Sequence, residues 1–174
     1  LVQRSQIKLY VDGLTQNTTA RTLVTYLIDY GFGTPMGLNY FDEDRLTAYI
    51  TDLERIGYDF HIHAIGAGGV RESLNAIERA RAANPSITDR RHRLTHLEHV
   101  HPDDVPRFAS LGVIADIQLA GDFTDPDLFE TYSAPFIGAN NPALPLPARA
   151  LIDAGAMVTL SSDFDVSPLN PFRG

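Results

Sequence analysis

The chain has 174 residues, of which 44% are hydrophobic and 21% charged. This composition is that of a folded globular domain, and it excludes a disordered or fibrous chain. A formal net charge of -8 without any basic tract argues against nucleic acid as a partner. The sequence contains no cysteine, so a bound metal would need histidine, carboxylate or less usual ligands. Its apolar runs are far shorter than the ~20 residues that span a bilayer, and no membrane partner is expected.

The first third of the chain predicts two strands and a helix between them. Apolar and polar residues alternate over 6–12, which indicates a strand, and the spacing over 18–30 favours a helix or an ordered loop. Asp42 can cap a clearer helix that ends at Gly57. A second alternating strand is predicted over 59–65.

The rest of the chain repeats this alternation of helix and strand. The further predicted elements are a glycine-rich turn over 66–69 that leads into a helix ending near residue 84, a strand over 91–98, a helix over 103–111, a strand over 113–118, a proline-rich connection over 122–147, a helix over 148–154 and a strand over 156–162. This order favours parallel strands, either in an open doubly wound α/β sheet or in part of a (β/α)8 barrel. A barrel has eight units and ~250 residues, so about three units would be missing.

Polar side chains gather where the predicted strands end. The active sites of both architectures lie at the carboxyl ends of the strands. The residues at these ends are Lys8 and Asp12, then His61 and His63, then His96, then Gln118, and finally Ser161, Ser162 and Asp163. Imidazole and carboxylate bind Zn²⁺ when no thiolate is available. We therefore expect two histidines and an aspartate from separate strands to converge.

Six segments carry a resemblance to a known family. They are IKLYVDG at 7–13, FHIHAIG at 60–66, RLTH at 93–96, RFASLGV at 107–113, LIDAGA at 151–156 and SDF at 162–164. In this order they resemble the amidohydrolase superfamily, specifically its family 3, which includes enzymes similar to N-substituted formamide deformylase. The resemblance implies a single-domain fragment over 1–174, truncated at both ends, that supplies strands four to eight of a metal-dependent hydrolase TIM barrel.

The resemblance also implies roles for four residues. Lys8 matches a lysine that related enzymes carboxylate so that it bridges two metals, and His63 and His96 match metal ligands. Asp163 matches the aspartate that binds metal and takes the proton from the metal-bound hydroxide. The implied cofactor is Zn²⁺, as one or two divalent ions, since a metal lowers the pKa of bound water to ~7 and polarises a carbonyl.

Two departures from the family pattern bear on activity. The family's His-x-His of the first barrel strand has no counterpart, because His61 and His63 follow the lysine strand instead of preceding it. The usual Gly-Asp after the fifth-strand histidine is Gly66-Ala67 here, which removes a carboxylate near the site.

Each assigned residue also has a structural interpretation. Outside its motif, His63 would be an interior histidine, Lys8 a charge on an edge strand and Asp163 a turn residue or helix cap. The order of the motifs favours metal ligation by His63 and catalysis by Asp163. For Lys8, a carboxylated and an unmodified side chain are both left open. For His61, a helper or structural role is favoured over ligation.

The other histidines near His96 form no predicted metal cluster. Only His96 fits a strand end, and we expect His99 and His101 to be surface residues of the loop before the next helix. The glycines over 66–69 lack the spacing of a phosphate-binding loop, so a tight turn is predicted there.

Two classes of function follow. The first is a metal-dependent hydrolase that cleaves the amide-type C–N bond of a small N-acyl or N-formyl substrate through a metal-activated hydroxide, and the cytoplasm is its expected location. The alternative is a non-catalytic structural or regulatory remnant of the same fold. By itself, a five-strand unit would leave two sheet edges unpaired and expose apolar residues such as Ile65 and Leu94, which favours a homo-oligomer or dependence on a missing half.

Overall fold

Residues 5–118, 127 and 129–164 are described by the computed structural model of the chain. Its centre is a five-stranded parallel sheet in the order β1-β2-β3-β5-β7. The strands are β1 (Gln6–Tyr10), β2 (Asp59–Ala64), β3 (Arg93–His96), β5 (Ile114–Gln118) and β7 (Val158–Ser161). The α/β class and the five parallel strands expected from the sequence are thereby confirmed.

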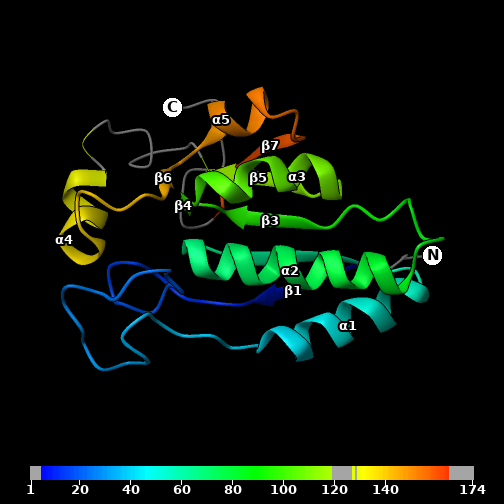
Figure 1. The fold of residues 1–174 in the computed structure, drawn as a ribbon, viewed down its shortest axis with the longest axis horizontal. Helices are drawn as coiled ribbons and strands as arrows, with labels where there is room; N and C mark the ends of the chain where they lie inside the picture. The colour runs from blue at the N-terminus through cyan, green and yellow to red at the C-terminus, as the bar shows by residue number, and fades with distance from the viewer. Residues whose placement is uncertain (1–4, 119–126, 128, 165–174) are drawn as a thin grey trace.

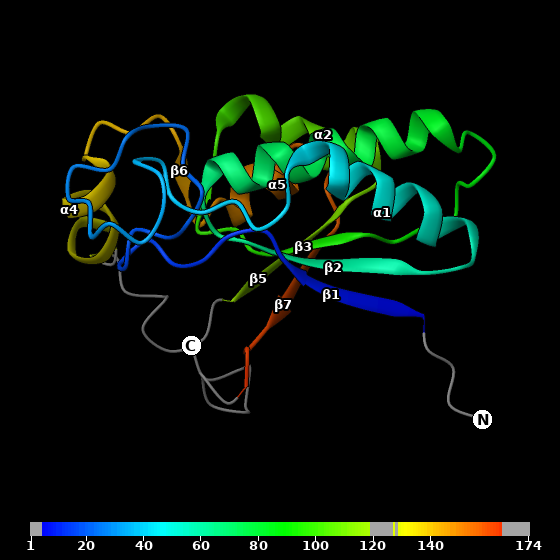
Figure 2. The ribbon, with the colours of Figure 1, turned by 90° about the horizontal axis from the view of Figure 1, so that it is seen from below.

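The connecting helices all cover one face of the sheet. They are α1 (Glu43–Arg55), α2 (Ala67–Ala83), α3 (Val105–Leu111, after the 3-10 turn η1, Pro102–Asp104) and α5 (Ala148–Asp153). Figure 2 shows the four helices on one side of the strands, while no helix of the described residues covers the other side. The described residues therefore form two layers, a sheet and its helices, and the second face of the sheet is open. No helix in the described ranges is long and apolar enough to cross a membrane.

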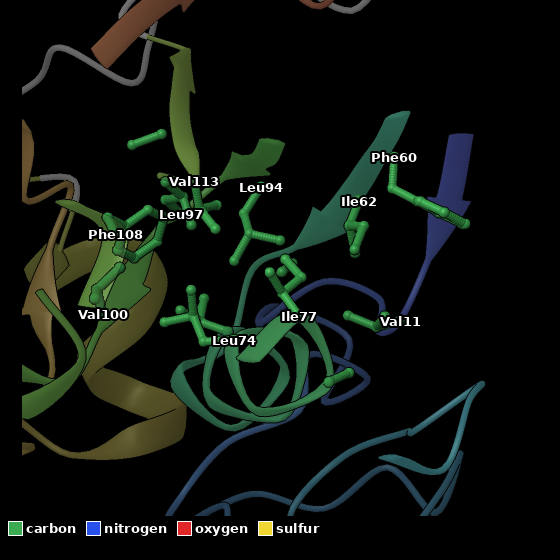
Figure 3. Packing of buried hydrophobic residues seen from close by; sticks show 14 of the residues in the cluster. Val11, Phe60, Ile62, Leu74, Ile77, Leu94, Leu97, Val100, Phe108 and Val113 are labelled. Atoms are coloured by element: carbon green, nitrogen blue, oxygen red, sulfur yellow. The ribbon is translucent and has the colours of Figure 1, made fainter. Parts of the chain in front are cut away.

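Alternation along the strands decides which side chains enter the core. Phe60, Ile62 and Leu94 are fully buried in the hydrophobic core cluster, to which α2 contributes Leu74 and Ile77 (Figure 3). The next residues along each strand face the open side, and on β2 these are two histidines.

The expectation that Ile65 and Leu94 would be exposed is wrong. Their exposed fractions are 1% and 0%. Leu94 belongs to the hydrophobic core cluster that also contains Leu74 and Ile77 of α2, and Ile65 is buried just after the end of β2. The open face instead carries polar side chains.

Predicted capping residues set both ends of α1. The Asp42 carboxylate accepts the backbone N–H of Arg45, and Glu43 and Asp44 occupy the first turn of α1, where the helix dipole favours negative charge. At the other end Gly57 takes a φ of 98°, a conformation that glycine adopts without the usual steric cost.

The segment over 18–30 is an ordered loop, the second of the two structures its spacing allows. Leu23, Leu27 and Tyr30 are exposed, so most of the apparent helical stripe lies outside the core. Only Tyr26 of this stripe is buried. Polar contacts order the loop instead: the Tyr26 hydroxyl donates to the Ala20 carbonyl, and the backbone N–H of Arg21 donates to the Asp12 carboxylate.

The proline-rich connection contains structure that the sequence pattern did not predict. A π-helical turn, η3 (Phe129–Ser133), continues into the short helix α4 (Ala134–Ile137). Further on, β6 (Leu144–Pro145) pairs antiparallel with β4 (His99–Val100) to form a second, two-stranded sheet (Figure 1). Strands of two residues and helical turns of four or five residues are too short to show a period.

Candidate metal centre

The first two strands place a lysine, a tyrosine and two histidines on the open face. Lys8 stands opposite His61 in the register of β1 and β2, and Tyr10 stands opposite His63. Their neighbours Ile7 and Leu9 pack on the other face, against the core. The Lys8 ammonium lies 5.2 Å from the centroid of the Tyr10 ring, and that ring is 4.7 Å from the His63 ring.

The backbone of β3 brings His96 to His63. Strict alternation would turn His96 toward the helices with Leu94, but His96 and Leu97 take φ angles of 78° and 54°. Non-glycine residues adopt this left-handed conformation at an energetic cost, and such strain is concentrated at functional sites. The centroids of the His96 and His63 rings lie 4.3 Å apart.

Hydrogen bonding leaves one nitrogen of His63 available. Its Nε2 lies 3.1 Å from the Gly13 carbonyl oxygen and 3.5 Å from Asp12 Oδ1. Both are acceptors, so Nε2 carries the proton and Nδ1 keeps its lone pair. Nδ1 is buried without a hydrogen-bond partner among the described residues, an arrangement that a divalent cation fits.

Burial holds both imidazoles in the neutral form that binds metal. It lowers the pKa of His96 to about 3, with further lowering from the nearby His63, Lys8 and His61. It also lowers the pKa of His63, against the opposing effect of the Gly13 carbonyl. Neutral imidazole is the form in which histidine ligates Zn²⁺.

Two opposing effects act on the pKa of Lys8. Burial lowers the pKa of its amine, while the negative charges of Asp163 and Asp116 oppose that change. A lowered pKa increases the fraction of neutral amine, which is the form that reacts with CO₂.

Asp163 lies on the turn after β7 with a φ of 49°. It lines a cavity of about 20 Å³, large enough for about one water molecule, together with His96, Glu98, Gln118 and Leu146. Within the described ranges, no three His, Asp or Glu side chains are arranged so that they could hold an ion. The structure therefore pairs His63 with His96 and places Lys8 and Asp163 nearby, while the four-residue ligand set itself stays a prediction.

Sequence reasoning missed two carboxyl groups. Burial raises the pKa of Glu98 to about 7, and this side chain lines the same small cavity as Asp163. Asp116, only 3% exposed, accepts hydrogen bonds from three hydroxyl groups on the open face. A single charge inside the apolar run that forms β5 is the sequence signal that could have indicated Asp116.

Asp12 has a larger structural role than its place at a strand end suggested. Its carboxylate accepts the backbone N–H groups of Ile65, Gly66 and Arg21, and so joins the end of β1 to the start of α2. Burial raises its pKa to about 7 although these three hydrogen bonds oppose the shift.

The remaining histidines have mainly structural surroundings. His99 is 2% exposed and lies on β4, so the expected surface position is wrong. His92 is fully buried; its Nδ1 accepts the N–H of Phe60, and its Nε2 lies 3.0 Å from Glu54. His101 is in the predicted loop and accepts the N–H of Asp103 at the start of η1.

Comparison with known proteins relates the whole chain to one family. The model of the amidohydrolase family matches residues 1–174. The protein LONG AFTER FAR-RED 3 of Arabidopsis thaliana is 27% identical over 169 residues, which cover 96% of this chain and 27% of the plant protein.

Solved structures show the same fold. Uncharacterized metal-dependent hydrolases from Pyrococcus furiosus and Pyrococcus horikoshii OT3 superpose with TM-scores of 0.73 and 0.74, at 22% and 21% identity. Each match covers 95% of this chain and 32% or 31% of the archaeal protein, so the chain spans about a third of their length. With a family match over its full length and the fold of a partial (β/α)8 barrel, the chain belongs to the amidohydrolase family.

Proposed function

We propose that this chain carries part of the active site of a metal-dependent hydrolase that cleaves the amide-type C–N bond of a small N-acyl or N-formyl substrate. The observation that carries the proposal is the contact between His63 and His96, two neutral imidazoles whose rings lie 4.3 Å apart. His63 has one nitrogen held by Gly13 and the other buried with no hydrogen-bond partner in the described part of the chain, which is the state of a ligand prepared for a cation.

His63 and His96 would hold the ion, with Lys8 beside them, and Zn²⁺ is the proposed metal. When bound, the ion supplies a Lewis acid that polarises the substrate carbonyl and acidifies water. Asp163 would take a proton from the attacking water and give it to the leaving nitrogen. The new C–O bond replaces the C–N bond, and the products are a carboxylic acid and an amine.

An open cavity of about 650 Å³ borders Lys8 and His63 and supports a small-molecule substrate. Its walls are mostly apolar, and Tyr10, Leu14 and Tyr40 contribute to them. Such walls suit the carbon part of an acyl group or amine substituent, and the volume is within the usual range for ligand sites.

The proposal is tested in the complete protein that carries this sequence. Asp163→Asn should keep the bound metal, measured by elemental analysis, while turnover of N-formyl and N-acyl amines falls by ~10² or more, since positioned acid-base groups contribute that much. His63→Asn should lose metal and turnover together. Unchanged turnover in Asp163→Asn would remove Asp163 from the mechanism.

The same experiment separates the non-catalytic alternative. That alternative is favoured by the lack of a three-residue His, Asp or Glu ligand group in the described ranges and by Ala67 at the position of the family's aspartate. A wild-type protein that neither retains a divalent ion nor hydrolyses these amides would support the non-catalytic role and overturn the proposed function.

A further inference from the structure

Four side chains on the open face form a closed ring of hydrogen bonds. Thr95 on β3 and Ser161 on β7 both donate their hydroxyl hydrogens to Asp116 Oδ2, each over 2.9 Å. Gln118 Nε2 then reaches the same two hydroxyl oxygens, over 2.9 Å to Thr95 and 2.7 Å to Ser161. The ring spans three adjacent strands, since β5 pairs with β3 on one side and β7 on the other.

Asp116 sets the direction of every hydrogen bond in this ring. An ionised carboxylate accepts only, and a hydroxyl has a single hydrogen, so Thr95 and Ser161 give theirs to Asp116. Each hydroxyl oxygen can then only accept from Gln118. Both hydrogens of the Gln118 amide are used in this way, and its carbonyl oxygen must point away from the ring.

The carbonyl of Gln118 is therefore presented to the candidate site. Gln118 is 5% exposed, and no described residue donates a hydrogen bond of ordinary geometry to its Oε1. Gln118 lines the small cavity that also contains His96 and Asp163. The donor that reaches this carbonyl is His96: a side-chain hydrogen bond with Gln118 opposes the burial that lowers the pKa of His96, and a neutral imidazole carries one N–H to give.

We propose that Gln118 is a positioning residue that accepts the N–H of His96 and so directs the other imidazole nitrogen toward the metal. It does for His96 what the Gly13 carbonyl does for His63, and Asp116 acts through it by fixing the orientation of the amide. The inference rests on the proposed function only in that the freed nitrogen is the one that meets the ion. Acceptors behind histidine ligands fix the tautomer, and their loss weakens metal binding by 10–100-fold in other proteins.

The direct test is Gln118→Met, which keeps the volume and removes the acceptor. In metal-free wild-type protein, the two ring nitrogens of His96 should show ¹⁵N shifts of one fixed tautomer, and in the variant these shifts should move toward the average of two tautomers. Zn²⁺ affinity, measured by titration against a competing chelator, should fall by ~10-fold or more. Thr159→Val is the matched control, because Thr159 donates to Asp116 Oδ1 and does not contact Gln118.

A second set of variants changes the ring without touching Gln118. Asp116→Asn alone should be silent, because its NH₂ can turn toward Thr159 and leave its oxygen facing Thr95 and Ser161. When Asp116→Asn is combined with Thr159→Val, the NH₂ of the substituted side chain loses the Thr159 hydroxyl as its acceptor and turns to the hydroxyls of Thr95 and Ser161. Their hydrogens then turn to Gln118, whose NH₂ faces His96. We expect the double variant to repeat the effect of Gln118→Met.

The readouts separate this inference from the proposed function. A His96 tautomer that is unchanged in Gln118→Met and in the double variant would overturn the positioning role, even in an active enzyme. A tautomer that changes as expected, in a protein whose wild type binds no Zn²⁺, would uphold the orientation of His96 and overturn the proposed function.

Discussion

At the scale of single residues, the histidines connect the site to the stability of the fold. Burial lowers the pKa values of His61 and His99 to about 4 and of His96 to about 3, so the folded protein holds these rings neutral. A base whose pKa is lowered on folding stabilises the protein above its unfolded pKa near 6.5, and this contribution is lost as the pH falls toward the folded value. Folding raises the pKa values of Asp12 and Glu98 to about 7. Their contribution to the unfolding free energy therefore falls as the pH rises toward 7.

His99 offers the cleanest test of this balance, because burial is the only cause of its shift. Its shift from 6.5 to about 4 corresponds to ~3 kcal/mol that wild type loses between these pH values. We expect His99→Leu to reduce the loss of unfolding free energy between pH 6.5 and 4.5, measured with urea. His101→Leu, at a partly exposed position, is the control for replacing a histidine by leucine. Parallel curves for wild type and His99→Leu would show that protonation of His99 is not resisted by the fold.

Residues at strand ends were predictable from the sequence, whereas their partners were not. Motif order placed His63 and His96 at the carboxyl ends of neighbouring parallel strands, which meet at the same edge of the sheet. The left-handed backbone of His96 and the hydroxyl ring around Asp116 depend on contacts between residues far apart in the chain. Such contacts leave no local period or spacing in the sequence.

At the scale of elements, prediction succeeded where local and tertiary signals agree. The helix after Asp42 has a cap, an acidic first turn and a buried stripe, and all three were visible in the sequence. Over 18–30 the apolar spacing suited a helix, yet the polar contacts of Asp12 and Tyr26 hold a loop. A spacing pattern forms a helix only where another element covers the stripe, and here Leu23 and Leu27 remain exposed.

The glycine cluster at the start of α2 is explained by the close approach of backbone. A Cβ at Gly66 would lie 2.1 Å from the Arg21 carbonyl oxygen, and one at Gly68 would lie 2.6 Å from that of Thr22. These glycines therefore let the start of α2 contact the loop after β1. The tight turn predicted over 66–69 is not formed: Gly66 is the extended N-cap, and residues 67–69 already belong to the first turn of α2, whose glycines are required by the backbone packed behind it.

This packing predicts the effect of Gly66→Ala. Because the added methyl meets backbone rather than a flexible side chain, we expect destabilisation of ~3 kcal/mol or more, at the upper end for overpacked sites. Gly57→Ala is the matched control: its Cβ meets nothing within 4 Å, and only its left-handed φ of 98° costs about 1–2 kcal/mol. Urea unfolding of both variants compares them. Equal losses would mean that the loop after β1 yields to the methyl group.

At the scale of the whole molecule, the open face and the two edges of the sheet are the surfaces through which this unit could associate. β1 pairs only with β2 and β7 only with β5 within the described residues, so one side of each strand is left without a strand partner there. The open face carries Lys8, the two histidines of β2 and the ring of hydrogen bonds around Asp116 instead of a hydrophobic core. Association of this unit is therefore expected to proceed through strand edges, in contrast to the burial of an apolar face.

The edge of β1 gives the sharpest test of such association. Ser5 O and Val11 N bond to β2, so the alternation of a parallel strand turns the N–H of Gln6 to the free side. We expect the 174-residue chain to associate as its concentration rises, and Gln6→Pro to reduce this association, because proline removes a donor that only the free edge presents. Light scattering after size-exclusion chromatography measures the mass, and thermal unfolding checks that the variant keeps its fold. A wild-type chain that stays monomeric at every concentration would mean that the edges are already protected, and association unaffected by Gln6→Pro would assign it to another surface.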